Sequence, residues 1–207
     1  MTYIIIIVTV ITSYLGFQNR EIFDKYKFNP YMIYHRKEYA RILGHGFLHA
    51  DWTHLLVNML VLWSFGITLE NYFAELRRAG IIPWSTAFFL ILYLGGLAIS
   101  SLPTLFKNKD DHSYNSIGAS GAVSSVTFAC IFLAPMQKLY LYFIPIPIPG
   151  FIFGISYLAY SYYMSRQQKD NVNHDAHFVG AIWGFLFPVF FDLRHPLNIF
   201  AIFDRAY

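Results

Sequence analysis

The feature that most constrains this chain is a short Gly-rich segment, Gly118-Ala119-Ser120-Gly121, followed by an apolar run that ends at Pro135. A helix of about 14 residues, at about 1.5 Å rise per residue, spans roughly 21 Å. The hydrocarbon core of a bilayer is about 30 Å thick, so a helix that ends at one face begins below the other. Ser120 is therefore expected inside the membrane, on irregular backbone that is tolerated there only within protein or beside a water-filled cavity.

The composition of the chain is that of an integral membrane protein. Of the 207 residues, 56% are hydrophobic and 13% are charged, about half the charged share of roughly 25% in soluble proteins. The length predicts one domain, residues 1–207. The net charge of +3 is small and scattered, which argues against a nucleic-acid partner and is consistent with contact to a lipid bilayer. The single cysteine, Cys130, excludes an intramolecular disulfide.

Apolar stretches predict an all-α fold of six transmembrane helices, at about residues 3–17, 52–70, 83–102, 120–134, 151–165 and 176–191. A long structured loop is expected between the first two. The segment Glu70–Gly80 is interpreted as a charged turn, and the prolines at 145, 147 and 149 exclude a helix there. The apolar start, without a basic region or a cleavage site, is interpreted as a retained first span.

Polar residues stand at the starts of the second, fourth and sixth predicted spans, which share one membrane face because they run in the same direction. His54 and Asn58 are four residues apart and so lie on one helical face. Ser120 begins the fourth span and His177 lies near the start of the sixth. The apolar stretches that follow are of similar length, which places all four at a similar depth. Polar groups within spans are costly and usually functional.

These residue types fit acyl transfer. A serine hydroxyl needs a neighbouring base to become a nucleophile, and histidine can take that proton near neutral pH. The oxyanion needs donors, which His54, Asn58 and the Ser120 backbone N–H can supply. Small residues would let the fourth and sixth spans approach closely; these are Gly118, Ala119, Gly121, Gly180 and Gly184. We therefore expect His177 within hydrogen-bond reach of Ser120.

Together these motifs resemble the rhomboid family of intramembrane serine proteases. The likeness covers essentially the whole chain, in order and spacing. Its three core motifs are His54-Leu55-Leu56-Val57-Asn58, Gly118-Ala119-Ser120-Gly121 and Ala176-His177-Phe178-Val179-Gly180. The flanking residues agree as well; these are Arg41, His45, His49 and Glu70. We interpret these four flanking residues as structural support, with His45 and His49 fixing the loop above the site.

The resemblance implies a Ser120–His177 dyad without an acidic third member, and an oxyanion hole formed by His54, Asn58 and the Ser120 amide. It implies cleavage of transmembrane protein substrates near small residues, with no cofactor and no metal. We expect a multi-pass protein of the bacterial cytoplasmic membrane, and the sequence predicts no oligomeric state. Asp175 is not assigned to a triad, because residues two apart on a helix do not share a face.

One departure leaves a question open. Many members of the family carry an aromatic residue four positions after the serine, stacked on the histidine. Here that position is Ser124. The sequence therefore does not say what orients the ring of His177.

Two other functions remain as alternatives. The first is a catalytically inactive rhomboid-like protein that binds transmembrane segments, although such proteins usually lack the serine or the histidine. The second is a membrane metalloenzyme, because His45 and His49 form an HxxxH pair with His54, His174 and His177 near the same face.

Overall fold

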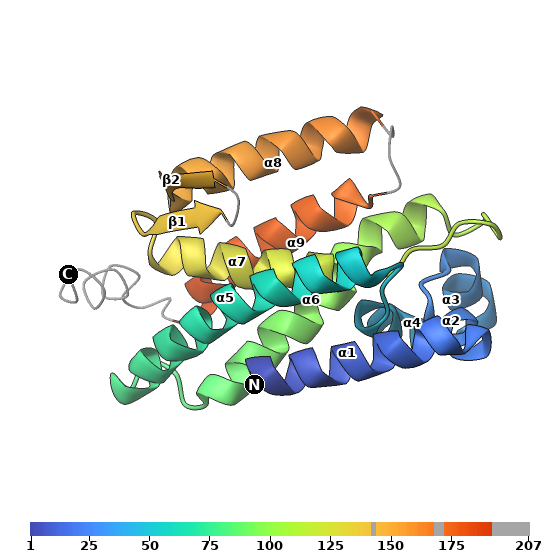
Figure 1. The fold of residues 1–207 in the computed structure, drawn as a ribbon, viewed down its shortest axis with the longest axis horizontal. Coiled ribbons are helices and arrows are strands. Elements are labelled where there is room, and N and C mark those ends of the chain that lie inside the picture. The colour runs from blue at the N-terminus through green and yellow to red at the C-terminus, as the bar shows by residue number, and fades with distance from the viewer. Residues whose placement is uncertain (142–143, 168–171, 192–207) are drawn as a thin grey trace.

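The chain is described by a computed structural model that covers residues 1–141, 144–167 and 172–191. It is mostly helical (Figure 1). In chain order the elements are α1 (Thr2–Gln18), α2 (Arg20–Tyr26), α3 (Pro30–Arg36), α4 (Arg41–Gly44), η1 (His45–Phe47), α5 (Trp52–Arg78), α6 (Ser85–Lys107), α7 (Ser120–Leu133), β1 (Lys138–Leu141), β2 (Ile144–Pro149), α8 (Gly150–Gln167), α9 (His174–Leu186) and η2 (Phe187–Phe191). The last part of the predicted domain, residues 192–207, lies outside the described residues.

A helix occupies each of the six ranges where the sequence predicts one, namely α1 and α5 to α9. Within the described part of the chain, α5 and α6 are long and apolar enough to cross a membrane by themselves, while α1 and α7 are shorter apolar helices. Large apolar side chains are exposed on α1, α5, α6, α8 and α9, for example Ile7 on α1, Leu56 on α5 and Ile155 on α8.

The prediction of a charged turn from Glu70 to Gly80 is wrong, because α5 continues without a break to Arg78. Glutamate and arginine are good helix formers, and Arg78 pairs with Glu75 almost one turn earlier. The chain turns instead at Gly80, whose φ of +74° is a conformation that glycine adopts without steric cost.

The all-α prediction also misses a two-stranded antiparallel sheet, in which β1 pairs with β2. The prolines of β2 do exclude a helix, as expected, but they do not exclude a strand. Pro145, Pro147 and Pro149 occupy every second position. In a two-stranded sheet alternate N–H groups of each strand point away from the partner, so proline at those positions need not cost a ladder hydrogen bond.

Helix α7 lies at the centre of the bundle and contacts α5, α6 and α9, with α1 and α8 on opposite sides (Figure 1). All residues of α7 except Ser120 and Phe132 are buried. Close packing against α9 depends on glycine. A Cβ at Gly180 would lie 2.2 Å from the carbonyl oxygen of Gly121, and one at Gly184 would lie 2.0 Å from that of Ser125.

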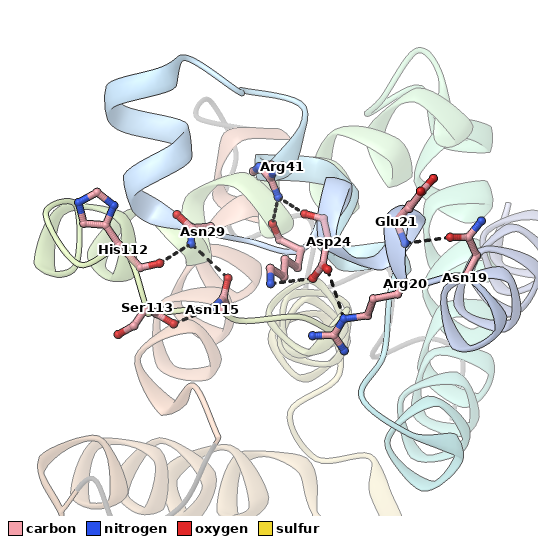
Figure 2. Close-up of polar contacts among 10 residues, drawn as sticks. Asn19, Arg20, Glu21, Asp24, Asn29, Arg41, His112, Ser113 and Asn115 are labelled. Carbon is pink, nitrogen blue, oxygen red and sulfur yellow. Dashed lines mark hydrogen bonds and ion pairs between the residues drawn. The ribbon is translucent and has the colours of Figure 1, made fainter.

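The segment between α1 and α5 forms short helices with local caps. The Asn19 side chain accepts from the backbone N–H of Glu21 at the start of α2, and Asn29 caps α3, whose first residue is Pro30. Arg41 donates to the carbonyl oxygens of Asp24 and Lys27, at 2.6 and 3.0 Å. Figure 2 shows Arg41 pointing toward Asp24. Buried Arg41 therefore ties α4 to the end of α2.

The same segment reaches the loop that precedes α7. Phe28 and Ser116 exchange two backbone hydrogen bonds of 2.9 Å. The Asn29 side chain donates to the carbonyl oxygen of His112 and to the side chain of Asn115 (Figure 2). These contacts fix the loop that leads into Ser120.

Candidate active site

All four predicted catalytic residues line one cavity of about 780 Å³. Ser120 is the first residue of α7, His177 is the fourth of α9, and His54 and Asn58 lie in the first two turns of α5. The cavity is therefore built by the N-terminal ends of three neighbouring helices. Its wall includes hydroxyl-bearing residues from α6, Ser100 and Ser101, and apolar residues from α5 and α8.

Gly118 shapes the approach to Ser120. Its backbone has a φ of +117°, which L side chains rarely adopt, and its N–H donates to the carbonyl oxygen of His45 at 3.0 Å. The ring of His54 lies against it, since a Cβ at Gly118 would be 2.7 Å from His54 Cε1. Glycine is thus required here both for the turn and for the space that His54 fills.

The first turn of α5 holds His54 and Asn58 in place. The carboxylate of Asp51 accepts the backbone N–H of His54 at 2.8 Å, which caps the helix. The Asn58 side chain is buried and donates to the His54 carbonyl oxygen at 2.9 Å. A side-chain amide has two N–H groups, so Asn58 has a second donor available for another acceptor.

The ring of His177 faces Tyr157 of α8. The two rings are stacked, with centroids 6.3 Å apart and planes inclined by 23°. The Tyr157 hydroxyl lies 2.7 Å from the hydroxyl of Ser124 on α7. An aromatic ring therefore does lie beside His177, but it comes from α8 and not from α7. Sequence reasoning missed Tyr157, because nothing in a tyrosine-rich helix distinguishes it from its neighbours.

Asp175 is engaged elsewhere. Its carboxylate accepts a hydrogen bond from the Ser165 hydroxyl and lies 3.8 Å from the ammonium group of Lys107. The start of α9 is capped instead by Asn173, whose side chain accepts from the Ala176 N–H at 3.1 Å and pairs with Thr104 on α6.

The two loop histidines each meet a serine. A ring nitrogen of His45 is 3.0 Å from the Ser101 hydroxyl, and one of His49 is 3.0 Å from that of Ser13. Burial lowers the pKa of His45 to about 4. Burial, with a smaller contribution from His54, lowers the pKa of His49 to about 3. Both rings are therefore neutral near pH 7 and link the loop to α6 and α1.

The remaining support residues join helices to one another. Glu70 accepts hydrogen bonds from the backbone and side chain of Thr2, at 2.5 and 3.1 Å, and so joins α5 to α1. Gly121 packs against α6, where a Cβ would be 2.2 Å from the Ser100 hydroxyl.

The Rhomboid domain family matches residues 36–193, which include every predicted site residue. The chain is 30% identical over 145 residues to RHOMBOID-like protein 12, mitochondrial, of Arabidopsis thaliana, covering 68% of the chain and 43% of that relative. It is 28% identical over 149 residues to Rhomboid protein 1, mitochondrial, of Saccharomyces cerevisiae, covering 70% and 40%. The chain thus spans less than half the length of these curated relatives.

Both relatives are named as mitochondrial proteins. Their names do not agree with the bacterial cytoplasmic membrane expected for this chain. The family match itself extends over more than half of the chain, in agreement with the motifs at Ser120 and His177. The chain belongs to the rhomboid family of membrane proteins.

Proposed function

We propose that the chain is an intramembrane serine endopeptidase that cleaves transmembrane segments with Ser120 as nucleophile and His177 as general base and acid. One observation carries the proposal. Ser120, His177, His54 and Asn58, which come from three helices, line the same cavity. Membership in a family that generally consists of serine proteases supports it.

The chemistry follows from the positions of these groups. The Ser120 hydroxyl attacks the scissile carbonyl carbon while His177 takes its proton. The oxyanion is stabilised by the Ser120 N–H, which points out of the first turn of α7 without an intrahelical acceptor, and by the second amide N–H of Asn58 and the ring of His54. His177 then returns the proton to the leaving amine, and a water molecule hydrolyses the acyl-enzyme by the same steps in reverse.

The proposed setting is one rhomboid domain of six membrane-spanning helices, α1 and α5 to α9. Outward-facing apolar side chains on α1, α5, α6, α8 and α9 support it. Helix α7 has 14 residues, or about 21 Å at 1.5 Å per residue, so Ser120 would lie below the surface of a core about 30 Å thick. The mitochondrial names of the relatives favour a mitochondrial over a bacterial membrane.

The substrate that fits this site is a transmembrane helix that opens locally. An intact helix keeps its carbonyls in i→i−4 hydrogen bonds, out of line for attack. Glycine costs about 1 kcal/mol in a helix and proline about 3, so either residue near the cleavage site lowers the cost of opening. Small residues also let the substrate backbone approach the crowded surface around Gly118 and His54.

A cleavage assay in proteoliposomes tests this function. The substrates are two matched segments, one poly-Leu and one poly-Leu with a central Gly-Pro pair. We expect wild type to cut the second near that pair, Ser120→Ala to cut neither, and EDTA to have no effect. Binding without cleavage by wild type would favour the inactive binder. Loss of activity in EDTA that a metal ion restores would favour the histidine-cluster metalloenzyme.

A further inference from the structure

We propose that Tyr157 is a positioning residue that holds the ring of His177 in the orientation in which it deprotonates Ser120. The inference rests on the proposed function and deepens it. It also answers the question that Ser124 leaves open, because a different helix, α8, supplies the aromatic ring that stacks on His177.

Tyr157 is itself held on several sides. Its ring stacks on His177 and packs against Phe128 of α7 at 5.5 Å and Phe153 of α8 at 5.9 Å between centroids. Its hydroxyl meets the Ser124 hydroxyl at 2.7 Å. The ring therefore has a fixed position relative to α7, the helix that carries Ser120.

The stacking contact with Tyr157 restricts the orientation of the His177 imidazole ring. The terminal torsion of a histidine side chain is broad, so packing rather than rotamer preference must select one ring plane. Stacked aromatic pairs are favourable in an offset arrangement, and the plane of Tyr157 restricts the rotation of His177. The small side chain of Ser124 leaves room for the tyrosine and provides its hydrogen-bond partner.

The position of Tyr157 on α8 has a consequence for the reaction. Only Gly150, Gly154 and Ser161 of this helix are buried, and it lies on the outside of the bundle (Figure 1). When α8 packs against α7, His177 has its stacking partner. When α8 moves outward, His177 loses it, so alignment of the base depends on the packing of this peripheral helix.

The rate at which a small fluorophosphonate labels Ser120 in detergent tests the inference, because this probe requires an activated serine but no transmembrane substrate. Tyr157→Leu removes the ring and should slow labelling about tenfold. Tyr157→Phe keeps the ring and loses the hydroxyl with its bond to Ser124, so it should keep most of the wild-type rate. Tyr163→Leu, an exposed position on the same helix, is the matched control and should label normally. In the cleavage assay Tyr157→Leu should lower kcat and leave KM unchanged.

Labelling of Tyr157→Leu at the wild-type rate, or equal slowing by Tyr157→Phe, would overturn the inference while leaving the proposed function intact. If wild type itself is not labelled in a manner that depends on Ser120, the proposed function fails and the inference fails with it. Thermal melting of each variant checks folding. If Tyr157→Leu does not fold, Tyr157→Met replaces it, because methionine keeps much of the volume without a planar ring. Slow labelling of Tyr157→Met would then support the inference, and labelling at the wild-type rate would overturn it.

Discussion

The ring of His54 occupies the space that a side chain at Gly118 would need, since a Cβ there would lie 2.7 Å from His54 Cε1. Gly118 precedes Ser120 by two residues, and His54 is a proposed oxyanion donor. The backbone that presents the proposed nucleophile and a group that would stabilise the intermediate are therefore in direct contact.

Gly118→Ala should lower kcat by about a hundredfold, because it strains a backbone of positive φ and displaces His54. Gly80→Ala is the matched control, since Gly80 also has a positive φ but no atom within 4 Å of its Cβ position. Both variants should lose stability through backbone strain, and only Gly118→Ala should lose most of its activity. Equal activity in the two would show that the contact with His54 does not matter.

Asn58→Ala should reduce kcat by about 10²–10³, the usual cost of losing one oxyanion donor, with little change in KM. Its stability should also fall slightly, because the bond to the His54 carbonyl oxygen is lost. Steady-state kinetics in proteoliposomes measure both constants. A rise in KM at constant kcat would mean that Asn58 binds substrate in the ground state and is not an oxyanion donor.

Gly184→Ala should destabilise the protein by about 1–3 kcal/mol, the typical cost of overpacking a core. The new Cβ would lie 2.0 Å from the Ser125 carbonyl oxygen, so α9 must move away from α7. At Gly154 the nearest atom would be 3.5 Å away, an ordinary contact, so Gly154→Ala should keep wild-type stability. Thermal melts in detergent compare the two, and equal melting temperatures would contradict the packing described here.

Several helix boundaries could be predicted from the sequence. The starts of α5 and α7 agree with prediction because local signals mark them. Asp51 caps α5, and Gly118 makes the turn into α7. The sequence does not predict the continuation of α5 past Glu70, because charged residues that follow an apolar run occur both in turns and in continued helices. The sequence does not predict the strand at Ile144–Pro149, because this proline-rich segment forms a strand only through its pairing with β1.

The candidate site likewise contains residues that the sequence predicts and residues that it does not. Ser120, His177, His54 and Asn58 stand out because polar residues are costly in apolar spans. The sequence does not distinguish Tyr157 from the other tyrosines of α8. Its proposed role depends on how α8 packs against Ser124 and His177, and the residue pattern of α8 does not predict those contacts. The partners of His45 and His49, Ser101 and Ser13, are likewise set by tertiary packing.

Stability should fall as the pH drops from about 6.5 toward 4. The pKa of His45 is about 4 in the folded state and near 6.5 in an unfolded chain, so in this window the unfolded state binds more protons. Each such histidine contributes a slope of up to about 1.4 kcal/mol per pH unit, with His49 acting in the same direction. His45→Gln should flatten the dependence of melting temperature on pH. His112→Gln, at an exposed position, should not, and an unchanged slope in His45→Gln would contradict the burial argument.

Cleavage rates of Ser120→Ala, His177→Ala and the double variant show whether Ser120 and His177 act as one catalytic unit. Ser116→Ala, at a serine four residues earlier in the loop before α7, is the matched control and should cut normally. Each single substitution should leave only a small residual rate of cleavage, and the double variant should be little slower than either, because residues that act as a unit are not additive. Clear turnover by Ser120→Ala would rule out Ser120 as the nucleophile, and multiplicative losses in the double variant would show that the two residues act independently.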